Sequence, residues 1–82
     1  MNIMSGNYAI AYADKNGKGF SDTEPWIDDN YGDDLSSCLI RAKEMIVEGY
    51  KNVIPFQFSK RERESYSWKY VRQRKIEDTD KI

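Results

Sequence analysis

The most regular pattern of apolar and polar positions lies in the middle of the chain. Six apolar residues recur there at intervals of three and four, the spacing that places side chains on one stripe of an α-helix: Leu35, Cys38, Leu39, Ala42, Met45 and Ile46. Asp33 or Asp34 stands before the stripe, where a carboxylate can accept hydrogen bonds from the first amides of a helix. Gly49 follows and suits the left-handed residue that ends many helices, so the pattern predicts a helix from about Leu35 to Gly49.

Strict alternation, which is typical of strands, appears in three other segments. Residues 8–13 place large side chains on one side and alanines on the other. Residues 53–58 alternate likewise, and Pro55 among them predicts a strand that lies at an edge of the sheet or carries a bulge. In residues 65–75 three aromatic residues recur at intervals of two, which favours a strand over a short helix: Tyr66, Trp68 and Tyr70.

The stretch DKNGKGF after the first of these segments begins like the calcium loop of an EF-hand, with an acid, an Asn and a Gly at the expected places. Lys18 then stands at the fifth place, Ser21 at the eighth and Pro25 at the twelfth, where the loop requires an oxygen ligand, an apolar residue and a Glu. A lysine would set a positive charge where the cation belongs. We therefore predict a hairpin turn here and no metal site.

The turn itself suits a three-residue loop between Asp14 and Lys18, in which Asp14 starts a type I turn and Gly17 adopts the left-handed conformation. The length of this loop sets the register of the hairpin. We expect it to place Phe20 opposite Tyr12 and to add the Phe20 ring to the large apolar side of the sheet.

The hairpin adds a second strand after Gly17, so the segments give the order strand, strand, helix, strand, strand. A helix with one apolar stripe must pack on another layer, and the smallest arrangement that hides the stripe has two layers. We therefore predict an α+β fold: a small two-layer domain with one helix packed on a mainly antiparallel sheet. We expect the large side chains of all strands to point towards the helix. At 82 residues the chain suits a single domain, 1–82, with an ordered core of about 7–76 and frayed termini.

The lack of His and the single Cys limit the catalytic and metal-binding chemistry that the chain can perform. The sequence holds no His, the commonest general acid–base group and zinc ligand, and its one Cys, Cys38, falls within the apolar stripe, where we expect it to be buried. We therefore expect no enzyme, no cofactor and no cysteine-based metal cluster. The N-terminal segment has neither a basic stretch before an apolar run nor a long hydrophobic stretch, so we expect a cytoplasmic protein without a signal peptide or a membrane span.

Charge is divided unevenly along the chain, although the net charge is only −1. Residues 1–34 carry seven acids against two lysines, a balance of −5, whereas residues 35–82 balance at +4. Four acids of the segment 22–34 are candidates for docking on a basic surface of another protein: Asp22, Glu24, Asp28 and Asp29. The same segment also fits a solvated loop that caps a helix, or a site for a divalent cation.

The opposite charge gathers between residues 60 and 75. Seven basic residues stand there among three aromatic ones: Lys60, Arg61, Arg63, Lys69, Arg72, Arg74 and Lys75. This combination can bind nucleic acid, with the rings stacking on bases and the cations neutralising phosphates. In the alternative, the three rings are core side chains and the charges keep an edge strand soluble. A small domain needs its large side chains inside, which favours the alternative.

The sequence thus predicts a small non-enzymatic protein-binding module, an inhibitor or adaptor of the phage or mobile-element type, which docks through the acidic segment 22–34 or the basic segment 60–75. A nucleic-acid-binding protein that uses the basic segment is the first alternative, and a divalent-cation-binding protein is the second. The expected partner is another protein, with nucleic acid as the other candidate.

Overall fold

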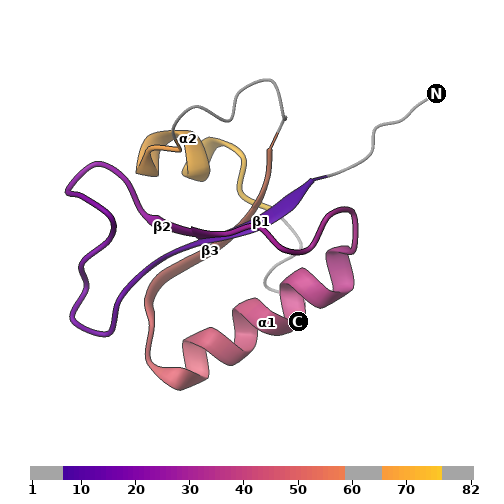
Figure 1. The fold of residues 1–82 in the computed structure, drawn as a ribbon, viewed down its shortest axis with the longest axis horizontal. Coiled ribbons are helices and arrows are strands. Elements are labelled where there is room, and N and C mark those ends of the chain that lie inside the picture. The colour runs from indigo at the N-terminus through magenta and orange to yellow at the C-terminus, as the bar shows by residue number, and fades with distance from the viewer. Residues whose placement is uncertain (1–6, 59–65, 77–82) are drawn as a thin grey trace.

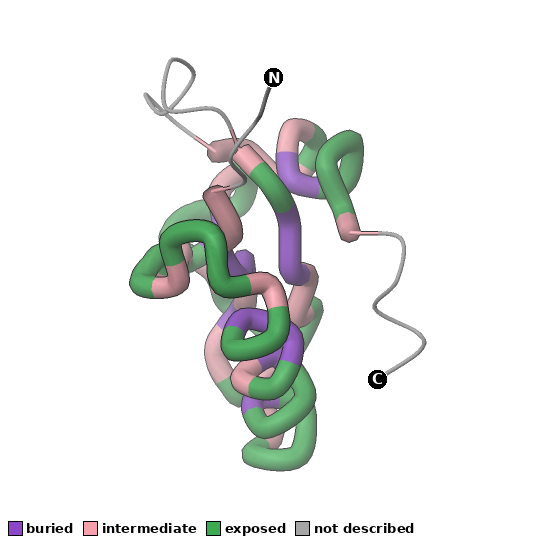
Figure 2. The backbone as a smooth tube through the Cα atoms, turned by 90° about the vertical axis from the view of Figure 1, so that its right-hand side faces the viewer, coloured by how far each residue is buried: buried purple, intermediate pink, exposed green. Residues whose placement is uncertain are grey.

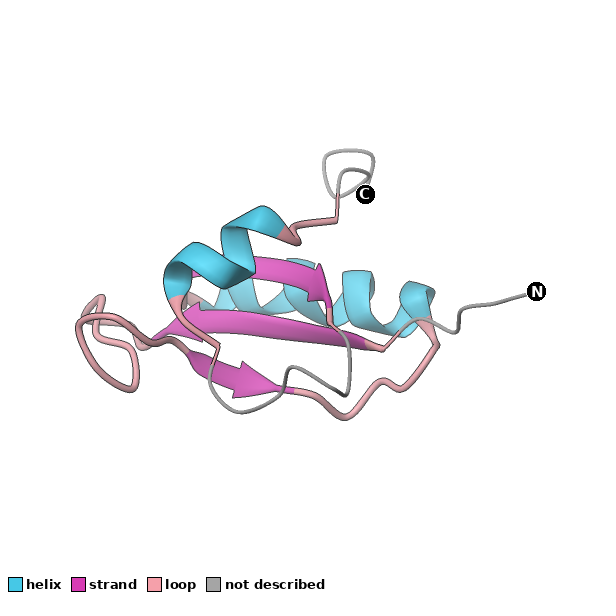
Figure 3. Ribbon diagram, turned by 90° about the horizontal axis from the view of Figure 1, so that it is seen from above, coloured by secondary structure: helices cyan, strands magenta, loops and turns pink. Residues whose placement is uncertain are grey.

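An antiparallel sheet of three strands forms the middle of the fold, with a helix on each side of it (Figure 1). The computed structural model describes residues 7–58 and 66–76. Along the chain the elements are β1 (Tyr8–Ala13), β2 (Trp26–Asp28), α1 (Leu35–Glu48), β3 (Lys51–Gln57) and α2 (Trp68–Gln73). The central strand β1 pairs with β2 on one side and with β3 on the other (Figure 3). The predicted α+β class, with a helix on a mainly antiparallel sheet, is therefore confirmed.

Both ends of α1 carry the caps that the sequence predicts. The Asp34 carboxylate accepts hydrogen bonds from the amide of Ser37 at 3.0 Å and from its hydroxyl at 2.8 Å. At the other end Gly49 has a φ of +106° and donates its amide to the Met45 carbonyl. The Gly49 amide also donates to the Ile46 carbonyl, and the Tyr50 amide donates to that of Met45, which completes a Schellman motif. These local bonds fix where the helix begins and ends.

β1 has buried residues on both faces of the sheet, so the sheet needs a layer on each side and not on one side only, as predicted. Figure 2 shows buried stretches in the strands and in the helices. On one face Ile10 forms a buried cluster with Cys38, Ala42 and Met45 of α1. A second buried cluster lies on the other face, where α2 and nearby rings pack: Ala9, Ala11, Phe56 and Val71. The alanines are small enough for this third layer to approach the sheet closely. The Phe56 ring thus faces away from α1, contrary to the prediction for the large strand residues.

α2 replaces the last predicted strand. Ser67 caps it, since the Ser67 hydroxyl accepts the Tyr70 amide at 3.1 Å. Val71 stands three residues after Trp68, and both side chains pack towards the same cluster, a spacing that a helix brings to one side. Tyr66 and Tyr70 stack with ring centroids 5.2 Å apart. Three aromatic residues at intervals of two necessarily include two that are four residues apart, here Tyr66 and Tyr70. That spacing also fits one turn of a helix, so the alternation does not exclude a helix.

The turn after β1 has the geometry that the sequence predicts. The Asp14 amide donates to the Lys18 carbonyl at 2.7 Å, and the Asp14 carboxylate accepts the amides of Asn16 and Lys18. Gly17 has a φ of +88°, which glycine adopts without steric cost. The Asp14 carboxylate is thus occupied by the backbone of its own turn.

The register of the hairpin beyond this turn differs from the prediction, because Trp26 and not Phe20 lies opposite Tyr12. The chain leaves the ladder and makes a second turn, in which Ser21 and Glu24 exchange backbone hydrogen bonds at 3.0 and 3.3 Å. The Phe20 ring is 62% exposed and meets the Trp26 ring edge-on at 5.5 Å. The second strand therefore begins inside the segment that was expected to be a loop.

β3 lies at an edge of the sheet, one of the two outcomes that Pro55 predicts. Pro55 is opposite Ile10, and its carbonyl points outward, where it accepts the Ile76 amide at 3.0 Å. The N–H and C=O of a residue in an antiparallel strand point to the same side, so the missing proline N–H costs no bond to β1. Nearer its start β3 carries a bulge with one extra residue, where Asn52 has a φ of +51°.

Candidate binding surface

A hollow of about 470 Å³ lies between the loop after β1, the bulge of β3 and the helix α2. Residues from these three places line it: Gly17, Lys18, Gly19, Phe20, Ser21, Asp22, Asn52, Trp68 and Arg72. The three segments are far apart in the sequence, so only the folded chain brings them together. We call this place the loop–helix hollow.

Gly19 lets the loop and α2 approach each other closely. A Cβ atom at this position would lie 2.7 Å from the Glu24 carbonyl oxygen and 3.3 Å from the ring of Trp68. The Trp68 amide also donates to the Thr23 carbonyl at 2.9 Å, which ties the first residue of α2 to the loop. Two walls of the hollow are thus held together by a hydrogen bond and by packing that leaves no room for a side chain at Gly19.

Lys18 and Arg72 bring two exposed positive charges to the loop–helix hollow, against the one carboxylate of Asp22. The Arg72 guanidinium lies over the Trp68 ring, with 5.5 Å between the guanidinium carbon and the ring centroid. Such stacking orders a guanidinium while its in-plane N–H groups can still bind a carboxylate or a phosphate. The exposed ring of Phe20 adds an apolar surface. The hollow can therefore bind an anionic group that has an apolar neighbour.

The structure describes only part of the predicted basic segment, residues 66–75. Four of its seven cations are described, all exposed within residues 68–76: Lys69, Arg72, Arg74 and Lys75. The other three lie outside the described residues: Lys60, Arg61 and Arg63. The Arg74 guanidinium lies 4.8 Å from the centroid of the Tyr70 ring, so Arg74, like Arg72, covers an aromatic side chain. The described part of this segment thus presents a positively charged surface.

The three aromatic residues of the same segment pack against the core, although Trp68 also lines the loop–helix hollow. Tyr66, Trp68 and Tyr70 are partly buried and contact the cluster that contains Phe56 and Val71. Edge-on ring contacts join Phe56 to Tyr66 at 5.6 Å and to Tyr70 at 6.5 Å. The interpretation of these rings as core side chains is therefore confirmed, although they belong to a helix and its approach and not to a strand.

The four acids that the sequence suggests for docking take different places in the fold. Asp22 lines the loop–helix hollow, Glu24 is partly buried and Asp29 is exposed. Asp28 lies on β2, where its carboxylate accepts a hydrogen bond from the Tyr31 hydroxyl and so has a partner within the fold. In the described part of the chain, no group of three or more His, Cys, Asp or Glu residues is placed to hold a metal ion.

The side chains between the sheet and α1 are held in their neutral forms. Burial raises the pKa of Tyr31 well above its usual range, and the hydrogen bond to Asp28 adds to this effect. Burial also raises the pKa of Cys38 to about 12, with a smaller contribution from the charge of Asp28. The Cys38 thiol lies 3.7 Å from the Ala9 carbonyl, to which it donates. Cys38 is thus a buried core side chain and not an activated nucleophile.

Comparison of the chain with protein-family models, with curated proteins and with solved structures finds no match. Within residues 7–58 and 66–76, no helix combines the length and the apolar character that crossing a membrane requires. The observations that bear on function are therefore the shape and charge of the surface.

Proposed function

We propose that the protein is a small non-enzymatic protein-binding module, an inhibitor or adaptor, that binds an acidic segment of its partner in the loop–helix hollow. The observation that carries the proposal is the convergence of Lys18 and Arg72 from distant parts of the chain beside the exposed ring of Phe20. An Asp or Glu side chain can pair with these cations while a neighbouring apolar side chain contacts the ring. The remaining cations of residues 68–76 extend the attraction beyond the hollow.

An acidic peptide suits this surface better than nucleic acid does. The rings that a single strand would need for stacking, Tyr66, Trp68 and Tyr70, are partly buried against the core, and the Arg72 guanidinium lies over the Trp68 ring where it lines the hollow. Asp22 in the lining repels phosphates, whereas a peptide can turn a backbone N–H towards it. Nucleic acid is the second candidate, because the exposed cations of residues 68–76 can neutralise phosphates without any stacking.

Amide NMR spectra of the full chain, recorded during titration with a short peptide of Glu and Phe residues, test the proposal. We expect shifts at residues 17–22, 52 and 68–72 at about 20 mM salt and their loss at about 500 mM, because salt screens exposed charges. Lys18→Glu and Arg72→Glu should each weaken binding about tenfold, since each reverses one of the two charges that face the peptide.

Lys15→Glu is the matched control, because Lys15 is an exposed lysine of the same turn that stands outside the lining of the hollow. It changes the net charge as Lys18→Glu does and should leave the affinity within about twofold. An oligonucleotide of equal charge is the second probe. If it binds more tightly than the peptide and loses binding in Arg72→Glu and Arg74→Glu, the nucleic-acid alternative replaces the proposal. Unchanged amide signals with both probes at millimolar concentration would refute the hollow as a binding site.

A further inference from the structure

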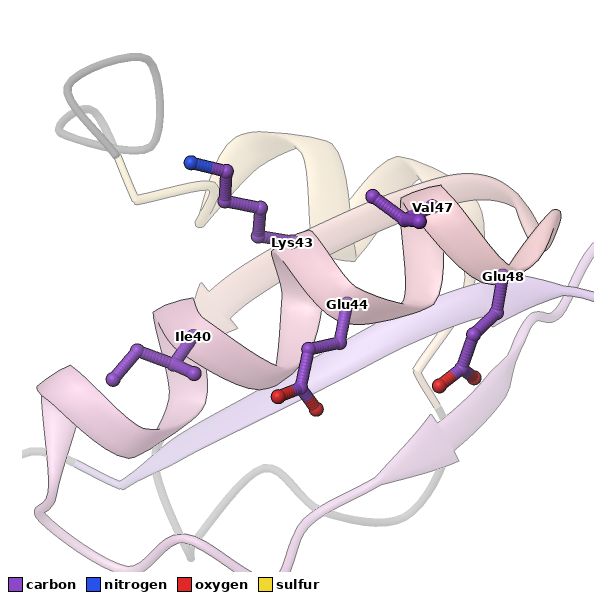
Figure 4. Close-up of a pocket in the computed structure, with 5 residues that line it drawn as sticks. All are labelled: Ile40, Lys43, Glu44, Val47 and Glu48. Carbon is purple, nitrogen blue, oxygen red and sulfur yellow. The ribbon is translucent and has the colours of Figure 1, made fainter.

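The side of α1 that faces away from the sheet carries a second candidate binding surface, made of aliphatic and charged side chains (Figure 4). Ile40 and Val47 stand seven residues apart on this side and are 55% and 82% exposed. Lys43, Glu44 and Glu48 complete the lining of a shallow hollow of about 480 Å³, and we call these five residues the α1 outer stripe. Large aliphatic side chains that are exposed on the same side of a helix indicate a surface that can pack against a partner.

We propose that the α1 outer stripe binds the same stripe of a second copy of this chain, with the two helices parallel and in register. Seven residues is the repeat that keeps one face of a parallel helix pair in contact. Ile40 therefore meets Ile40 of the second copy, and Val47 meets its Val47, across a twofold axis that runs along the helices. The proposal is independent of the loop–helix hollow, which other residues line.

The charges beside the stripe decide both the partner and the direction of packing. Figure 4 shows Lys43 on one flank of the helix and Glu44 and Glu48 on the other. When two such helices pack in parallel about a twofold axis along their length, the Lys flank of each copy faces the Glu flank of the other. An antiparallel pair would place lysine beside lysine and glutamate beside glutamate. The stripe is thus complementary to itself in the parallel direction.

Glu44 is the acceptor that we assign to Lys43 of the second copy. Arg41 holds Glu48 with two contacts, at 3.0 and 3.4 Å, but reaches Glu44 with one contact at 3.3 Å. The Glu44 side chain is 58% exposed, so a second cation can approach its other carboxylate oxygen. Two symmetric Lys43–Glu44 pairs therefore flank the aliphatic contact of the dimer.

The contact extends over only two turns of helix, so the dimer is expected to be weak. Specific and stable complexes bury about 1,200 Å² or more in total, which two turns of helix do not reach. We therefore expect a dissociation constant on the order of 100 µM.

Sedimentation equilibrium of the full chain between about 10 µM and about 1 mM measures this association. The average mass of the wild type should rise from the monomer value of 9.6 kDa towards twice that value. Ile40→Ser should raise the dissociation constant more than about tenfold, since it removes the isoleucine side chains of both copies from their mutual contact. Ile46→Ser is the control, because Ile46 is equally exposed, at 55%, but lies outside the stripe, and its association should match the wild type. Circular dichroism establishes that each variant is folded.

An exchange of charges tests the parallel register. Lys43→Glu and Glu44→Lys each place like charges across the interface, so neither variant should associate by itself. Their equimolar mixture should associate, because every Glu of one copy then faces a Lys of the other, and the double variant K43E/E44K should associate by itself for the same reason. A wild type that stays monomeric to about 1 mM would overturn the proposal. So would single charge variants that associate as the wild type does, or a double variant that stays monomeric.

Discussion

Gly19 offers a sharp test of how the loop after β1 packs against α2. Alanine at this position adds a Cβ atom 2.7 Å from the Glu24 carbonyl oxygen, 3.1 Å from the Pro25 Cα atom and 3.3 Å from a ring carbon of Trp68. The first two are backbone atoms, which cannot turn aside as the end of a flexible side chain can. The two limbs of the loop must therefore move apart, and the Trp68 ring of α2 must give way as well, or the loop remains strained.

Two effects of opposite sign set the change in stability for Gly19→Ala. Alanine restricts the unfolded chain, which stabilises a protein by about 0.4–1 kcal/mol where the backbone conformation suits it. Overpacking in a closely packed place costs about 1–3 kcal/mol. Because the contact with the carbonyl oxygen is so short, we expect the steric cost to win, with a net loss of about 1–2 kcal/mol in the free energy of unfolding.

Urea unfolding followed by tryptophan fluorescence measures this loss, with Gly32→Ala as the control. Gly32 has a φ of +55° and nothing within 4 Å of an added Cβ atom, so its substitution reports the backbone conformation alone, at a cost of about 1 kcal/mol. Only Gly19→Ala should also change the fluorescence of the folded state, because only this substitution disturbs Trp68. A Gly19→Ala protein as stable as the wild type, with unchanged fluorescence, would refute the close packing of the loop against α2.

The remaining predictions concern the helix cap, the thiol and the third layer. Hydrogen bonds from Ser37 hold the pKa of Asp34 below its usual value, so its contribution to stability is complete at neutral pH and is lost as the pH falls through the lowered pKa. Thermal unfolding between about pH 7 and pH 2 should show this loss in the wild type and not in Asp34→Asn, which keeps an acceptor that does not titrate; parallel curves would contradict the assignment. Cys38 is buried and has a pKa raised to about 12, so a thiol reagent at neutral pH should react with it at least about 100-fold more slowly than with the urea-unfolded chain, and equal rates would contradict its burial. Val71→Ala should lower the free energy of unfolding by about 2 kcal/mol, as measured in urea, because Val71 is fully buried where α2 meets the sheet; a loss below about 0.5 kcal/mol would show that α2 contributes no packing there.

Local signals account for the parts of the fold that the sequence predicts correctly. α1 needs its apolar stripe and two caps, and the Asp34 and Gly49 bonds that form these caps reach only a few residues along the chain. The turn after β1 likewise needs only Asp14 and Gly17, whose partners lie within the turn. A helix cap or a turn whose hydrogen bonds all lie within a short segment can be predicted from the sequence of that segment.

The parts that differ from the prediction depend on contacts between distant segments. Whether Phe20 or Trp26 continues the ladder is decided by the second turn of the loop, where Gly19 lies against α2. The alternation of aromatic residues favours a strand over residues 65–75, but the burial of Val71 against the alanines of β1 is satisfied by a helix. Ser67 is the local signal that could have indicated this helix, because its hydroxyl provides the N-cap.

The loop–helix hollow is not visible in the sequence, because its cations are widely separated. Arg72 stands among the residues predicted to bind nucleic acid, but nothing in the pattern joins it to Lys18. Asn52 carries a faint signal, since Asn tolerates the left-handed conformation that the bulge of β3 requires. Ile40 and Val47 stand on the polar side of the predicted helix, where the pattern gives them no role. A site made of side chains from several elements appears only when the fold is known.

The pairing of residues 74–76 with the outer edge of β3 ties the protection of that edge to the timing of translation. Residues 55–57 bond to this segment through backbone groups, and the ribosome adds residues 74–76 after all three strands. An uncovered edge strand can pair with a strand of another chain. The nascent protein is therefore open to misassembly in the interval between the completion of β3 and the docking of residues 74–76. Pro55 weakens that hazard, because it offers no N–H to an incoming strand.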